Sequence, residues 1–269
     1  MTWHTIALIA PDVYQISEPL GAIEPRFGVK TVSSYLVIGR ERAALIDSGL
    51  GISDLRAEVE AITALPCLVL ITHSHWDHIG ANAQFDETAV HELEAAQAAQ
   101  EPNVAAIRKA MRKPAAQATL PAGFDPAAYR VPARPATRVL RDDDRVDLGD
   151  RTLRVLHIPG HSAGHVAYHD GANGLLFSGD TACRSPVYAC CAGGDPAALL
   201  DSARRMAALP GVGMICPGHD EVITKEGWLP EFAANVQAAV SGQVEGTVRG
   251  GFIKGREFRF DTGPVWLPV

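Results

Sequence analysis

The stretch Ile71–Gly80, ITHSHWDHIG, places three histidines and one aspartate within six residues, directly after an apolar run typical of a buried strand. Residues two apart in an extended segment point the same way, so His73 and His75 can bind one ion. Asp77 and His78 follow across a turn and can face a second ion. Imidazole and carboxylate groups are ligands of zinc and neighbouring divalent metals, and burying four of them without a metal would be costly. The stretch therefore predicts a metal site.

Three later motifs carry the same kinds of side chain, each after a predicted strand. His161 lies in HIPGHSAGH, Asp180 in FSGDT and His219 in CPGHD. A lone histidine is more often a surface or core residue than a ligand. The clustered motif together with these three favours a metal site over a set of unrelated histidines. His4, His91, His157 and His169 are expected to be ordinary histidines.

These motifs, preceded by LIDSGLG around Asp47, resemble the five motifs of the metallo-β-lactamase superfamily and occur in the same order. The resemblance extends from Asp47 to His219. It implies an α+β fold, a four-layer αββα sandwich of two mixed sheets with helices outside, and metals at one edge.

The resemblance also implies a ligand set for two divalent ions, with Zn²⁺ expected and Fe or Mn as alternatives. It assigns His73, His75 and His161 to the first ion, Asp77, His78 and His219 to the second, and Asp180 to both as a bridge. Asp47 and His165 occupy supporting positions, where a side chain orients a ligand without holding the metal.

Two such cations, roughly 3.5–4 Å apart, can share one water and lower its pKa from 15.7 toward about 7. The expected reaction is therefore hydrolysis, with a metal-bound hydroxide attacking an electrophilic carbonyl or phosphorus. Asp180 would keep the ions together and Asp77 would steady the proton of the attacking water. Tyr188, in the loop TACRSPVYACCAGG, is a candidate hydrogen-bond donor to the substrate oxygen.

Single positions narrow the expected substrate. Asp180 stands where β-lactamases of this superfamily carry Cys or Ser, so β-lactamase activity is not expected as the main function. His75 stands where oxygen reductases of this fold carry Glu, which disfavours a redox role. A small ester-like substrate remains: a thioester, a lactone or a carboxylic ester. Only 50 residues follow His219, which disfavours the C-terminal region that binds glutathione in glyoxalase II.

Two alternatives stay open. A phosphodiesterase would use the same ligands. A non-enzymatic metal-binding or redox-sensing protein is supported only by Cys183, Cys190 and Cys191 near the site. The five cysteines include no C-x-x-C motif, so neither a disulfide framework nor a cysteine zinc site is expected, and the Cys190–Cys191 pair has no clear explanation.

The chain is expected to be one domain, residues 1–269, with an inserted helical and loop cap at about 92–138. Apolar residues of this cap either line a pocket or pack it onto the sandwich, and packing is favoured: Ile107, Met111, Leu120, Phe124 and Tyr129. Around the cap, a helix capped by Ser53, a helix capped by Asp195 and a last strand in REFRF are expected.

Composition is that of a globular chain, with 47% hydrophobic and 20% charged residues. The net charge of −7 disfavours a nucleic-acid partner. The apolar run at residues 6–10 is too short for a signal peptide or a membrane span. We therefore expect a cytoplasmic protein acting on a small molecule, without nucleic-acid or membrane partners. A homo-oligomer is possible, but the sequence does not determine the oligomeric state.

Overall fold

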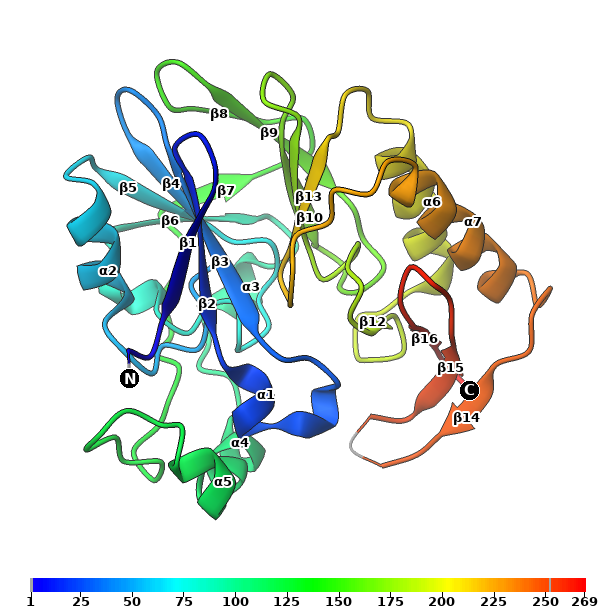
Figure 1. The fold of residues 1–269 in the computed structure, drawn as a ribbon, viewed down its shortest axis with the longest axis horizontal. Helices are drawn as coiled ribbons and strands as arrows, with labels where there is room; N and C mark the ends of the chain where they lie inside the picture. Colours follow the sequence, from blue (N-terminus) through cyan, green and yellow to red (C-terminus); the bar gives the residue numbers. More distant parts are fainter. Residues whose placement is uncertain (1, 252) are drawn as a thin grey trace. The chain divides into compact units, whose positions relative to one another are not determined.

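The computed structural model describes residues 2–251 and 253–269 (Figure 1). Contacts divide the chain into two compact units. The N-terminal unit contains the residues up to Leu140 and Asp147–Thr152, and the C-terminal unit contains Arg141–Val146 and the residues from Leu153 onward. Both units combine helices with mixed sheets, which confirms the α+β class. Over the described residues, every helix is too short or too polar to cross a lipid bilayer.

The N-terminal unit is built on a seven-stranded sheet whose strands follow one another in sequence order. The first four strands pair antiparallel and the last four pair parallel, with β4 common to both sets. Parallel neighbours need a crossover, and the helix α2 (Leu55–Ile62) supplies the one between β4 and β5. The strands are β1 (Thr5–Ala10), β2 (Val13–Glu18), β3 (Val32–Ile38), β4 (Ala43–Ile46), β5 (Cys67–Leu70), β6 (Glu87–His91) and β7 (Arg138–Leu140).

Two local expectations for this unit were incomplete or wrong. The apolar run near the N-terminus is part of β1, an edge strand that the sequence analysis did not assign. The helix α2 is capped by Asp54 and not by Ser53. The Asp54 carboxylate accepts a hydrogen bond from the Ala57 amide at 2.9 Å, and a carboxylate is at least as good an N-cap as a hydroxyl.

The cap predicted for residues 92–138 lies between β6 and β7 and contains three short helices: α3 (Ala95–Ala98), α4 (Ala105–Met111) and α5 (Pro114–Gln117). Figure 1 shows α4 and α5 close to α1 (Leu20–Ile23), in agreement with their contacts. Ile107, Met111 and Tyr129 are buried in the same core as the sheet, and Leu120 and Phe124 pack against it half-buried. These side chains therefore contribute packing, which was the favoured alternative.

The C-terminal unit contains a five-stranded mixed sheet in the order β13-β11-β10-β9-β8. The hairpin expected around residues 148–150 is present, with Gly149 at φ 104° in its turn. Two helices, α6 (Pro196–Ala207) and α7 (Trp228–Val240), pack against each other and share a buried core with this sheet. Asp195 caps α6 as expected, accepting from the amides of Ala197 and Ala198. The strands are β8 (Arg145–Asp147), β9 (Thr152–His157), β10 (Val166–Asp170), β11 (Leu175–Gly179) and β13 (Met214–Pro217).

The C-terminal unit also contains a four-stranded sheet, which was not predicted from the sequence. Its strands are arranged in the order β12-β16-β15-β14. The REFRF segment forms β15 (Gly255–Phe258), but it is not the last strand, because β16 (Val265–Leu267) follows and pairs with it. The short strand β12 (Val187–Tyr188) pairs parallel to β16. Two- and three-residue strands such as β12 and β14 (Thr247–Arg249) carry too little periodicity to be recognised in isolation.

Candidate metal centre

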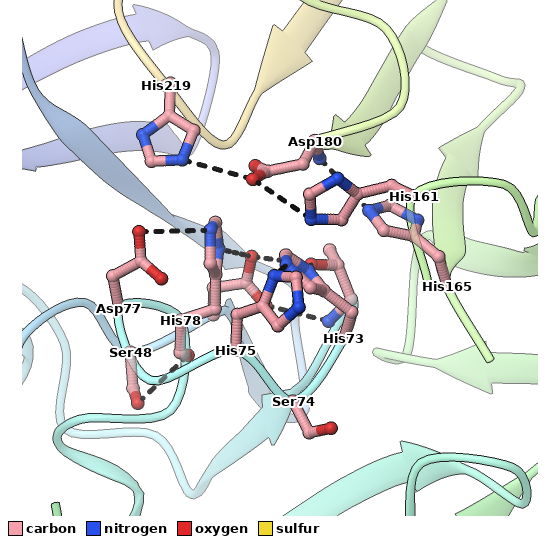
Figure 2. A network of polar contacts seen from close by, with 12 residues as sticks. Ser48, His73, Ser74, His75, Asp77, His78, His161, His165, Asp180 and His219 are labelled. Carbon is pink, nitrogen blue, oxygen red and sulfur yellow. Dashed lines mark hydrogen bonds and ion pairs between the residues drawn. The ribbon is translucent and has the colours of Figure 1, made fainter. Parts of the chain in front are cut away.

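The N-terminal unit gathers four of the expected ligands in the segment that leaves β5. His73 Nε2 lies 3.0 Å from His75 Nδ1, so both imidazoles direct a ring nitrogen at the same region (Figure 2). His78 Nε2 lies 3.9 Å from Asp77 Oδ2. His73, Asp77 and His78 are all buried. The His73 ring centroid lies 4.6 Å from that of His75 and 4.3 Å from that of His78, so the division of these side chains between two ions stays a prediction.

Asp47 fixes the orientation of two of these imidazoles. Its Oδ2 accepts from His78 Nδ1 at 2.8 Å and from the Thr72 hydroxyl at 2.8 Å, while Oδ1 accepts from the Thr72 amide at 2.7 Å. Since the Thr72 hydroxyl donates to Asp47, its oxygen accepts from His73 Nδ1 at 3.0 Å. Both histidines thereby direct Nε2 away from Asp47. A hydrogen bond of this kind at the far ring nitrogen is typical of histidines that ligate metals.

The turn that carries Asp47 depends on close backbone contacts. Asp47 has φ 58°, and the nearby Gly49 has φ 60°. The Gly80 amide donates to the Gly49 carbonyl at 2.8 Å, and a Cβ on Gly80 would lie 2.2 Å from the Leu50 carbonyl carbon. The final glycine of ITHSHWDHIG is therefore required for the ligand segment and the Asp47 turn to lie against each other.

Two buried glutamates support this region, and the sequence analysis did not identify either. Glu94 accepts from the amide and the hydroxyl of Ser74, which lies between the first two histidines. Glu18 accepts from the Leu50 amide at 2.6 Å and from Trp3 Nε1 at 2.6 Å. Burial raises the pKa of Glu18 to about 7. No local motif signals these roles, because the partners are distant in sequence. Glu94 lies 20 residues from Ser74, and Glu18 lies 32 residues from Leu50 and 15 from Trp3.

The C-terminal unit contributes a second set of ligands centred on Asp180. Asp180 Oδ2 lies 3.2 Å from His219 Nε2 and 3.6 Å from His161 Nε2, as the dashed lines of Figure 2 show. The three side chains follow the ends of β9, β11 and β13 and are all buried. One carboxylate oxygen thus lies within 3.6 Å of two imidazoles that are expected to be ligands.

The other ring nitrogen of His161 donates to the main-chain carbonyl of Tyr188 at 2.8 Å. This contact leaves Nε2 directed toward Asp180. The Tyr188 ring lies 5.4 Å from that of Trp266, and burial raises the pKa of its hydroxyl. The structure thus gives the backbone of Tyr188 a contact with a ligand, and the predicted hydrogen bond from its hydroxyl to substrate stays a prediction.

His165 holds the backbone of Asp180, the residue that is expected to bridge the ions. Its Nε2 accepts from the Asp180 amide at 3.0 Å, and the imidazole is fully buried. His165 therefore contacts the peptide of Asp180. This main-chain hydrogen bond is in line with the supporting role that the motif pattern implies for His165.

The remaining histidines make other contacts. His157 lies 2.9 Å from the Ala163 carbonyl, and His4 lies near Glu58 at 3.5 Å. Burial lowers the pKa values of His4 and His169. His91 Nδ1 accepts from the Leu93 amide at 3.4 Å. Their status as ordinary histidines stays a prediction.

The donor set of each unit fits a divalent cation. The donors are imidazole nitrogens and carboxylate oxygens, the types that zinc and its neighbours prefer. Histidines 73, 78 and 161 each use the opposite ring nitrogen for a hydroxyl, a carboxylate or a carbonyl. The residues present are therefore compatible with the divalent ions that the motif pattern implies.

Comparison with known proteins defines the class. The family model of the metallo-β-lactamase superfamily matches residues 27–219, and the chain therefore belongs to this superfamily. Its fold is shared with a solved metallo-β-lactamase family protein of Thermus thermophilus, with a TM-score of 0.62 and 26% identity. That match covers 87% of this chain and 82% of the other. The expected αββα fold class is confirmed at the level of this superfamily.

Two groups of relatives indicate the kind of enzyme within this superfamily that the chain resembles. The chain is 38% identical over 192 residues to the acyl-coenzyme A thioesterase MBLAC2 of Bos taurus, covering 67% of each protein. It is 34% identical over 155 residues to a hydroxyacylglutathione hydrolase of Fuscovulum blasticum, covering 56% of this chain and 48% of the relative. These relatives confirm the expectation of a metal-dependent hydrolase at the level of class.

Proposed function

We propose that this chain is a dinuclear metal-dependent thioester hydrolase. In this proposal the two units form one metallo-β-lactamase domain, and ligands from both units bind the same two ions. His73, His75 and His161 hold the first ion, Asp77, His78 and His219 hold the second, and Asp180 bridges them. Zn²⁺ is the proposed occupant because five of the seven ligands are imidazoles, and Fe or Mn are the alternatives.

The observation that carries the proposal is the position of Asp180 Oδ2 between His161 Nε2, at 3.6 Å, and His219 Nε2, at 3.2 Å. These two histidines are assigned to different ions, so a carboxylate oxygen between them is suited to join both. A single ion could bind all three side chains, so the metal content per chain distinguishes the dinuclear site from a mononuclear one. Aspartate at this position also differs from the Cys or Ser of β-lactamases.

When bound, the two ions supply a hydroxide nucleophile at neutral pH and polarise the substrate carbonyl. The chain's own residues orient these components. Asp77 is proposed to steady the proton of the attacking water by accepting a hydrogen bond from it, and the Tyr188 hydroxyl is proposed to donate to the substrate oxygen. Trp76, inside the ligand motif, forms one aromatic wall with Phe27 at 6.3 Å and Tyr129 at 6.5 Å between ring centroids.

A thioester is favoured over a lactone or a carboxylic ester because of the relatives. Both an acyl-coenzyme A thioesterase and a hydroxyacylglutathione hydrolase act on a carbonyl bonded to sulfur, and they are 38% and 34% identical to this chain. A thiolate is a better leaving group than an alkoxide at neutral pH. The site therefore needs to protonate or stabilise the leaving group less for a thioester than for an oxygen ester.

The test begins with purified chain and quantification of its metal by elemental analysis. About two ions per chain are expected, and the loaded protein should hydrolyse thioesters faster than lactones or aryl esters. Asp180→Asn should lower kcat at least about a hundredfold, because a lost bridging charge removes several kcal/mol of transition-state stabilisation. Asp201→Asn, an exposed aspartate on α6, serves as the control.

Faster turnover of a phosphodiester than of any thioester would replace this proposal with the phosphodiesterase alternative. Full metal content with no hydrolysis of either class would favour a metal-binding protein. Tyr188→Phe should retain the metal, because the contact of Tyr188 with His161 is made by its main-chain carbonyl. An unchanged kcat in that variant would remove the hydroxyl from the mechanism.

A further inference from the structure

A basic segment of the cap stands out in an otherwise acidic chain. Residues 102–124 contain four basic side chains and no Asp or Glu, whereas the whole chain has a net charge of −7. All four lie on α4 or directly after it: Arg108, Lys109, Arg112 and Lys113.

Three of these four side chains face solvent. Lys109, Arg112 and Lys113 are exposed, while Arg108 is half-buried and donates to the Tyr129 carbonyl at 3.1 Å. Arg108 thus helps to hold the cap, and the other three leave their charge in water. The basic residues of the last turn complement the negative end of the helix dipole, and the three exposed cations leave a positive surface that attracts anions.

The basic segment adjoins another cationic residue, Arg26, near the start of the chain. Helix α4 contacts α1, which precedes η1 (Pro25–Phe27), as Figure 1 shows in the lower part of the view. Arg26 of η1 is exposed and bonds to Glu24. The hydrogen bonds from Arg26 lower the pKa of Glu24, and the positive charge of Lys113 adds to this effect. The contacts of α1 with α4, α5 and η1 place the segments that carry Lys113 and Arg26 next to α1, and one carboxylate, Glu24, faces both cations.

The same surface is connected to the ligand segment through aromatic contacts within the N-terminal unit. Phe27, the neighbour of Arg26, has its ring centroid 6.3 Å from that of Trp76, which lies between His75 and Asp77 in the sequence. Arg26 therefore lies next to an aromatic pair that begins within the ligand motif. A substrate that reaches both features must be long, with an anionic end remote from its reacting carbonyl.

We infer that Arg26, Arg112 and Lys113 form a binding site for the phosphate groups of a coenzyme A thioester. This inference rests on the proposed thioesterase function. Coenzyme A carries a diphosphate and a 3′-phosphate at one end and its sulfur at the other, separated by the pantetheine chain. Arg and Lys are the side chains that bind phosphate, Arg through paired N–H donors and Lys as a point charge. Smaller thioesters without phosphate would meet only the aromatic wall.

The test compares one acyl group on two carriers, hexanoyl-coenzyme A and hexanoyl-N-acetylcysteamine. The wild-type chain should show kcat/KM at least about tenfold higher for the coenzyme A ester, and this ratio should fall as salt is raised. The double variant Arg112→Glu/Lys113→Glu should lower the ratio at least about tenfold. Arg145→Glu/Lys254→Glu, an equal charge change at two exposed residues of the other unit, should leave the ratio unchanged.

A direct binding measurement separates this inference from the proposed function. Isothermal titration with free coenzyme A should give a Kd that the Arg112→Glu/Lys113→Glu variant weakens at least about tenfold. Binding that the variant does not weaken, or an unchanged substrate ratio, would overturn the inference and leave the thioesterase proposal intact. Binding that depends on Arg112 and Lys113 without hydrolysis of either ester would overturn the thioesterase proposal and retain the phosphate site.

Discussion

Asp47 and His78 are 31 positions apart in the sequence, yet Asp47 Oδ2 lies 2.8 Å from His78 Nδ1. The same oxygen lies 2.8 Å from the hydroxyl of Thr72, whose oxygen lies 3.0 Å from His73 Nδ1. One buried carboxylate thus orients two of the proposed ligands, one directly and one through a hydroxyl. The consequences of this arrangement can be measured.

Asp47→Ala is expected to weaken metal binding about 10- to 100-fold, because both imidazoles lose the group that fixes their tautomer and orientation. Chelator competition on the folded variant measures this change. Asp47→Asn should have a smaller effect, since the amide oxygen can still accept one hydrogen bond. Equal metal affinity in Asp47→Ala and the wild type would contradict the orienting role.

His165→Leu is expected to reduce kcat more than it reduces folding stability. The substitution leaves the buried Asp180 amide without its acceptor, which costs about 1–3 kcal/mol, and releases the peptide that positions the Asp180 carboxylate, the proposed bridge. Urea unfolding and steady-state kinetics separate the two effects. His165→Asn should restore part of the activity if its side-chain oxygen reaches the amide. Full activity of the leucine variant would show that the contact is dispensable.

Gly49→Ala is expected to destabilise the fold by about 2–5 kcal/mol, through strain at positive φ and through overpacking. A Cβ at this position would lie 1.7 Å from Glu18 Oε2. Gly123→Ala is the matched control, since Gly123 also has positive φ, at 80°, but its added Cβ would meet nothing within 4 Å. Thermal unfolding of both variants should show a larger loss of stability for Gly49→Ala, and the difference measures the steric contact apart from backbone strain. Equal losses of stability would disprove the close packing at Gly49.

Glu18 should make stability fall as pH rises through the window between its unfolded and folded pKa values. Burial raises the folded pKa to about 7 from an ordinary value of 4.5, so the folded state holds the proton more tightly than the unfolded state. The contribution of Glu18 to stability is then fully present below pH 4.5 and is lost up to about pH 7, by about 3 kcal/mol in total.

Urea unfolding of the wild type and of Glu18→Gln at several pH values tests this prediction. The glutamine variant lacks the titrating group, so the difference between the two curves isolates Glu18 from the histidines that titrate in the same range. The difference should change by about 3 kcal/mol across the window. A difference that is independent of pH would show that Glu18 does not titrate there.

Much of the candidate site could be predicted from the sequence because its residues recur in short motifs at the ends of strands. The period-2 geometry of an extended chain brings His73 and His75 to one side, and parallel strands place their carboxyl ends at a common edge. The helix starting at Pro196 was also predictable, since its cap and first turn are local features.

Other features could not be predicted because they depend on residues distant in sequence. Ser53 and Asp54 are both good caps, and only the folded geometry selects Asp54. Strands β12, β14 and β16 are too short for a periodic signal and are stabilised mainly by pairing with their neighbours.

The sequence by itself determined the superfamily and predicted the kinds of ligand and their division into pairs, since these follow from residue types and short spacings. Only the tertiary structure showed how the ligands are supported. It showed that Glu18 and Glu94 hold the backbone beside the Asp47 turn and the histidine motif, that His165 contacts the Asp180 amide, and that the carbonyl of Tyr188 orients His161. The physical reason is that a main-chain amide or carbonyl has the same chemistry at every position, so the sequence carries no sign of which one a buried side chain will reach.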